Sequence, residues 1–81
     1  MAKLNITYRG LSADVPVPLD YNASDMDIKR IAVELIRSGE IPGLQVKNLD
    51  RYAFSHYVVD RFAAPDGDLR LFLRPKVPFG S

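Results

Sequence analysis

The sequence predicts an α+β protein in which one amphipathic helix packs across a mixed sheet of four to five strands. Three observations predict this class: two N-terminal segments of alternating apolar residues, one segment with helical spacing, and a further alternating segment near the C-terminus. The chain has 81 residues, of which 47% are hydrophobic and 26% charged, as in one small globular domain. It contains no cysteine, which excludes disulfide bonds and thiolate metal sites.

Two segments with a two-residue period begin the chain. In residues 3–9, and again in residues 14–20, apolar side chains alternate with polar side chains or prolines, as in strands with one solvated face. The short connection around Gly10 predicts an antiparallel hairpin. Pro16 and Pro18 remove backbone donors from the same side of the second strand, so this strand is expected at an edge of the sheet.

One amphipathic helix is expected over residues 25–38. Ser24 and Asp27 have the spacing of a capping box, and Gly39 suits the left-handed position just beyond a helix. The apolar residues between these signals recur at intervals of three and four, and they form one stripe. They are Ile28, Ile31, Ala32, Leu35 and Ile36.

The second half of the chain has a less regular pattern. Residues 44–47 are interpreted as a third strand, and residues 48–62 as a short strand followed by a turn or brief helical segment. Residues 65–68 have the composition of a turn. Residues 69–74 alternate again and predict the final strand, which we expect to lie beside the first strand.

The order of these elements resembles that of ubiquitin-like β-grasp proteins, including small bacterial ubiquitin-like modifiers. The resemblance rests on the N-terminal hairpin, the helix with its Ser-Asp entry, Gly39 with the Ile-Pro turn that follows, and the Leu-Arg-Leu-Phe-Leu-Arg run at residues 69–74. That run is similar to the family's last strand. The resemblance implies a β-grasp domain over residues 1–74 and an extended C-terminal tail over residues 75–81.

Covalent attachment through the C-terminus is the first function that the resemblance implies. In the family, an activating enzyme adenylates the terminal glycine carboxylate, which then passes to a thiol and on to a lysine amine or into sulfur chemistry. Gly80 is the matching position here, although it is followed by Ser81 and preceded by Phe79 instead of a second glycine. A protein modifier attached at Gly80 after a processing protease removes Ser81 is therefore one hypothesis, and a sulfur carrier is a lesser one.

A non-covalent adaptor or accessory subunit is the alternative from a different functional class. If the leucines of the last strand face the helix, then Arg70, Phe72 and Arg74 point to the other face of the sheet. Lys47 is expected near them on a neighbouring strand. Phe72 aligns with an apolar residue of the family's recognition patch, and an exposed phenylalanine ringed by cations suits a protein partner with an apolar pocket and an acidic rim.

No enzymatic centre, cofactor or metal site is predicted. His56 is the single histidine, and it follows Ser55, but adjacent residues of a strand point to opposite sides and no glycine-rich elbow surrounds them. The formal net charge of +1 argues against a nucleic-acid binder. No apolar run is long enough to span a bilayer or form a signal peptide, so we expect a cytoplasmic protein without a membrane partner.

Overall fold

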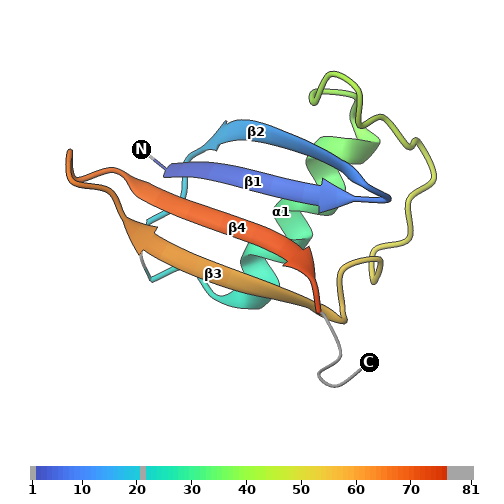
Figure 1. Ribbon diagram of the computed structural model, residues 1–81. Coiled ribbons are helices and arrows are strands. Elements are labelled where there is room, and N and C mark those ends of the chain that lie inside the picture. Colours follow the sequence, from blue (N-terminus) through green and yellow to red (C-terminus); the bar gives the residue numbers. More distant parts are fainter. Residues whose placement is uncertain (1, 21, 77–81) are drawn as a thin grey trace.

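The computed structural model describes residues 2–20 and 22–76. The element order is β1 (Ala2–Tyr8), β2 (Leu11–Val17), α1 (Asp25–Arg37), β3 (Tyr57–Ala63) and β4 (Leu69–Pro75). The strands form one mixed sheet in the order β2-β1-β4-β3, in which β1 and β4 are parallel and the other pairs are antiparallel (Figure 1). This arrangement confirms the predicted α+β class and is consistent with a β-grasp fold.

Strands β1 and β2 form the predicted N-terminal hairpin. Arg9 and Gly10 make the turn with φ angles of 51° and 80°, and positive φ at both central residues is what the tightest hairpin turns require. Strand β2 lies at an edge of the sheet, as predicted, and β1 lies beside β4 at the centre. It covers Leu11–Val17 instead of residues 14–20, so it contains Pro16 and ends before Pro18. Both sequence predictions about strand order are confirmed.

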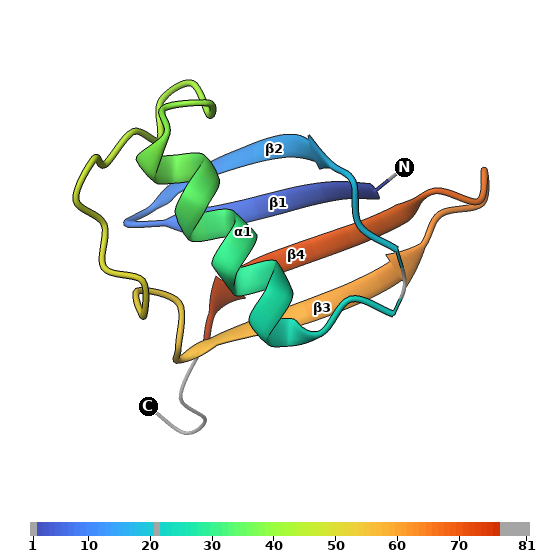
Figure 2. The same cartoon turned by 180° about the vertical axis from the view of Figure 1, so that it is seen from behind.

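Helix α1 crosses one face of the sheet (Figure 2). The Ser24 hydroxyl accepts a hydrogen bond from the Asp27 backbone N–H at 3.1 Å, and Gly39 beyond the other end has a φ of 76°. In the described part of the chain, no helix has the length and hydropathy needed to cross a membrane. The buried residues of α1 and of the strands it covers are Ile28, Ala32, Val33, Ile36, Ala2, Leu4, Ile6, Val17, Leu71 and Leu73.

The connection between α1 and β3 differs from the prediction. Residues 38–56 contain turns but no helix or strand, so the strand expected at residues 44–47 is wrong. Within residues 48–62 the order is also reversed, because turns come first and the strand follows. The connection runs past the end of the sheet at which the β1–β2 hairpin turns (Figures 1 and 2). Its buried side chains are Ile41, Leu44, Leu49 and Phe54.

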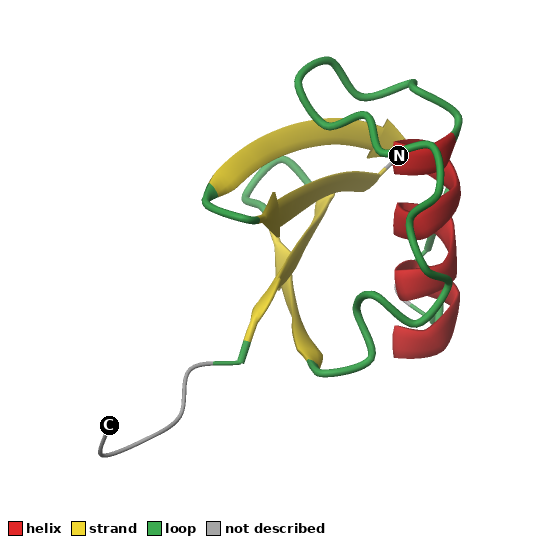
Figure 3. Cartoon of the chain, turned by 90° about the vertical axis from the view of Figure 1, so that its right-hand side faces the viewer, coloured by secondary structure: helices red, strands yellow, loops and turns green. Residues whose placement is uncertain are grey.

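The sheet has one covered face and one open face (Figure 3). Successive residues of a strand point to opposite faces, so the residues that alternate with the buried leucines lie on the open side, here called the outer face. Among residues 2–20 and 22–76, no helix or connection covers it (Figure 1). From the register, the outer-face residues are Lys3, Asn5, Thr7, Ser12, Asp14, Pro16, Val58, Asp60, Phe62, Arg70, Phe72 and Arg74.

Candidate functional site

Two phenylalanines from neighbouring strands form the apolar centre of the outer face. Phe62 of β3 lies across from Arg70, and Phe72 of β4 lies across from Asp60, so the two rings are diagonal neighbours. Their centroids are 5.6 Å apart and their planes meet at 76°, which is an edge-to-face contact. Phe62 nevertheless remains 56% exposed, and Phe72 is half-buried. The pair therefore presents aromatic surface to solvent.

The charged side chains around this aromatic pair fall into two groups. On one side, Arg74 Nε donates a hydrogen bond to Asp60 Oδ2 at 2.6 Å, so these two charges neutralise each other. On the other side, Lys3 and Arg70 lie directly across from each other on β1 and β4. No salt bridge within the described residues involves either of them. The unpaired positive charge of this half of the outer face is therefore concentrated at Lys3 and Arg70.

The β1–β2 half of the outer face has a different character. Asn5 Nδ2 donates hydrogen bonds to Ser12 Oγ at 3.1 Å and to Asp14 Oδ1 at 2.9 Å, so the amide joins the two strands through their side chains. These polar groups satisfy one another. The part of the outer face with unused binding capacity is thus the area over β3, β4 and the beginning of β1.

The structure brings three of the four predicted surface residues together. Arg70, Phe72 and Arg74 share the outer face of β4, as expected. Lys47 lies in the connection between α1 and β3, whereas the strands beside β4 are β1 and β3. The expectation that Lys47 sits on a strand next to Phe72 is therefore wrong, because no strand forms there. A binding role for these residues stays a prediction.

Phe62, like Lys3, is an outer-face residue that sequence reasoning did not assign to the site. It falls in a strand whose two faces are not separated by polarity, because Arg61 occupies the covered face and Val58 the outer face. The sequence signal that could have placed Phe62 on the outer face is the turn at residues 65–68. A hairpin closed by that turn places Phe62 across from Arg70, and therefore beside Phe72.

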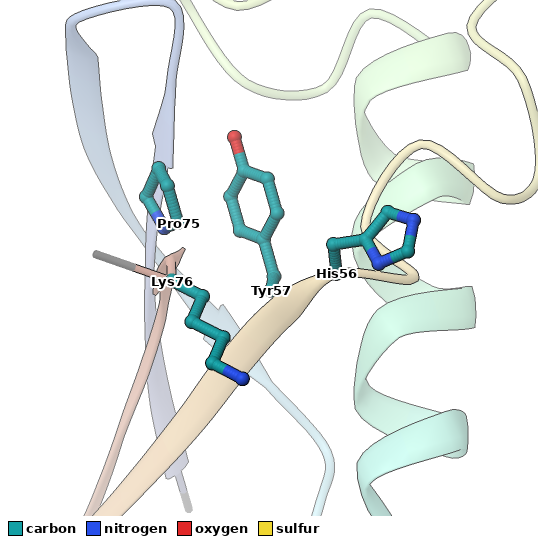
Figure 4. A pocket seen from close by; sticks show the side chains of 4 residues that line it. All are labelled: His56, Tyr57, Pro75 and Lys76. Carbon is teal, nitrogen blue, oxygen red and sulfur yellow. The ribbon is translucent and has the colours of Figure 1, made fainter. Parts of the chain in front are cut away.

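A second surface feature lies where β3 begins and β4 ends. It is an open depression of about 330 Å³ lined by His56, Tyr57, Pro75 and Lys76 (Figure 4). The Tyr57 ring stands edge-on to the buried ring of Phe54, with centroids 4.7 Å apart. Burial raises the pKa of the Tyr57 phenol, and the Tyr8 phenol adds to this shift.

Two further features concern metal coordination and covalent attachment. Across residues 2–20 and 22–76, no cluster of three or more histidine, aspartate or glutamate side chains is placed to hold a metal ion. Gly80, the predicted conjugation site, lies outside the described residues, together with most of the predicted tail. Its role stays a prediction.

Comparison of the chain with protein-family models, with curated proteins and with solved structures found no match. What is established is a small α+β protein with a four-stranded mixed sheet and one helix. Kinship with ubiquitin-like modifiers remains a prediction from the sequence. Function is therefore inferred from the side chains of this chain alone.

Proposed function

We propose that the protein is a non-covalent protein-interaction adaptor with a ubiquitin-like β-grasp fold, and that its outer face binds a partner protein. The observation that carries the proposal is the edge-to-face pair of Phe62 and Phe72 on the open side of the sheet. Aromatic side chains and arginine are preferred anchors at the centres of protein interfaces. Here both residue types lie side by side, since Arg70 is directly across from Phe62.

The clustering of the two rings is what favours a binding role. Single exposed apolar residues are ordinary on protein surfaces and need no functional explanation. Leu11, Met26 and Tyr52 are of that kind: they are 54%, 72% and 68% exposed, and they lie in β2, α1 and the connection before β3. Phe62 and Phe72, in contrast, combine their exposed surface at one place, on two hydrogen-bonded strands of the sheet.

The backbone beneath the pair also suits binding. Phe62 and Phe72 are on adjacent, hydrogen-bonded strands, and the Arg74–Asp60 ion pair links the same two strands across the outer face. A surface that is already ordered loses little conformational entropy when a partner binds. The face is therefore suited to act as a preorganised docking surface.

The proposal is tested by comparing three tagged proteins: the wild type, a Phe62→Ala/Phe72→Ala double variant, and Tyr52→Ala as a control for losing an exposed aromatic ring. Every protein that the wild type and the control capture from the native host is purified and titrated calorimetrically with all three proteins. We expect the double variant to bind at least about tenfold more weakly. Equal affinity of the wild type and the double variant for every captured protein would refute the proposal.

A further inference from the structure

We infer that Lys3 and Arg70 form an anion-binding subsite on the outer face, and that the partner segment bound there is both acidic and apolar. In this arrangement a carboxylate of the partner sits between the two cations, and an apolar side chain of the same segment packs on Phe62 and Phe72. The inference rests on the proposed function and adds the chemistry of the partner.

The first argument is the unfavourable placement of the two cations. Lys3 and Arg70 are direct cross-strand neighbours, and adjacent strands are about 4.8 Å apart. Like charges on neighbouring strands repel each other. Elsewhere on the same face, Arg74 has the counter-charge of Asp60, but Lys3 and Arg70 have no such partner among the described residues. An anion bound from outside would relieve the repulsion.

The second argument is a small cleft at the same place. Its volume is about 120 Å³, and it is lined by Ala2, Lys3, Pro16, Asp68, Leu69 and Arg70. The space taken by one water molecule in the liquid is about 30 Å³, so a carboxylate with a short methylene stem is of suitable size. Asp68 brings one negative charge to the rim against two positive charges, and it forms no salt bridge with either cation in the described structure. The cleft therefore remains net positive.

The third argument is the distance between the cationic and aromatic parts. Arg70 and Phe72 are two residues apart on β4 and point to the same face, which corresponds to about 6.7 Å along a strand. An extended partner segment has the same repeat. A carboxylate at one position and an apolar side chain two positions later would therefore reach the cleft and the phenylalanine pair together.

The placement of acidic residues favours a protein segment over single-stranded nucleic acid. Asp14 lies on β2 in the same row as Phe72, and its negative charge is not paired with a cation in the described structure, so a polyanion stacked on the rings would approach negative charge. The whole chain has a net charge of only +1. Nucleic-acid binding depends on neutralising many phosphates at once, which two unpaired cations do not provide.

The inference is tested by NMR titration of the isotope-labelled protein with two end-capped peptides, Ser-Glu-Thr-Leu-Thr and its glutamine analogue Ser-Gln-Thr-Leu-Thr. We expect the acidic peptide to shift the amide signals of Lys3, Arg70 and Phe72, and to bind at least about fivefold more tightly than the analogue. A Lys3→Gln/Arg70→Gln variant should abolish this difference. The matched control is Arg30→Gln/Arg37→Gln, which removes the same charge from exposed positions on α1 and should keep the difference.

Several outcomes would overturn the inference. They are absence of binding by the acidic peptide, equal binding of both peptides, and persistence of the preference in the Lys3→Gln/Arg70→Gln variant. Tighter binding of a short oligothymidylate at the same amides would identify the anion as a nucleic-acid phosphate, and would equally refute an acidic peptide as the ligand. The proposed function is tested separately, with the Phe62→Ala/Phe72→Ala variant. If that variant loses a captured partner while the Lys3→Gln/Arg70→Gln variant keeps it, the proposed function survives and only the anion-binding subsite is refuted.

Discussion

Arg61 of β3 reaches across the covered face of the sheet to Asp25 in the first turn of α1. Its guanidinium donates a hydrogen bond to the Ala23 carbonyl at 2.6 Å and also pairs with the Asp25 carboxylate. Arg61 lies across from Leu71, on the face that otherwise carries mainly apolar side chains. This contact links the start of α1 to the edge strand β3.

We expect Arg61→Met to lower the free energy of unfolding by about 1–3 kcal/mol, because a partly buried hydrogen bond from a charged donor is lost. Asp25→Asn should cost less than about 1 kcal/mol, since the Asp25 side chain is 60% exposed and solvent screens the ion pair. Urea denaturation of both variants measures the two values. Equal losses would show that the ion pair, and not the bond to Ala23, makes the main contribution.

Phe54 should be the main anchor of the connection between α1 and β3. Its ring is 1% exposed and stands edge-on to both Tyr8 and Tyr57, with centroids 5.9 and 4.7 Å away. We expect Phe54→Ala to cost about 3–5 kcal/mol of unfolding free energy, as for other large core truncations. Tyr52→Ala, two residues earlier and exposed, should change it by less than about 0.5 kcal/mol. A small effect of Phe54→Ala in thermal unfolding would show that the connection is held by other contacts.

The elements that the sequence predicts well are those with local signals. The hairpin has alternation and a Gly10 turn, and α1 has a cap at Ser24 and a stripe of constant spacing. The connection misleads because Leu44 is buried and Val46 is partly buried in an irregular segment without strand pairing, so their two-residue spacing imitates a strand. Strand β3 is obscured because Arg61 occupies an inward position, where a bond to the helix start offsets its polarity.

Only the β4 residues of the candidate site can be predicted from the sequence, for a related reason. The residues of β4 follow from alternation within one strand, but the neighbours that complete the site come from β1 and β3. Lys3 and Phe62 are 59 positions apart in the chain, and they join Arg70 in one row only because the strand order is β2-β1-β4-β3. Register across strands depends on the packed sheet as a whole, which no short window of sequence contains.

The raised pKa of Tyr57 predicts a loss of folding stability at alkaline pH. Burial raises its pKa above the ordinary value of 10.0, so above that pH the unfolded chain releases the phenol proton while the folded chain retains it. This contribution to stability is complete below pH 10.0 and is lost as the pH rises through the folded-state pKa. We expect Tyr57→Phe to reduce the decline in unfolding free energy between about pH 9 and about pH 12. Denaturant titrations of both proteins at several pH values measure this decline. An unchanged decline in Tyr57→Phe would mean that other groups cause the loss of stability at alkaline pH.

Attachment through Gly80 makes a prediction that is independent of the outer face. Glycine has no Cβ, so a chain that ends in glycine can bring its carboxylate close to a nucleotide in a narrow channel. A chain ending at Gly80 should therefore form higher-mass adducts in the native host without further processing, whereas a chain ending at Phe79 should form none. Intact-mass measurement and denaturing electrophoresis detect any adducts of these two chains. The full-length chain should form the same adducts only after losing Ser81, and Gly80→Ala should abolish them. Adducts from the chain ending at Phe79, or from none of these proteins, would remove the modifier hypothesis.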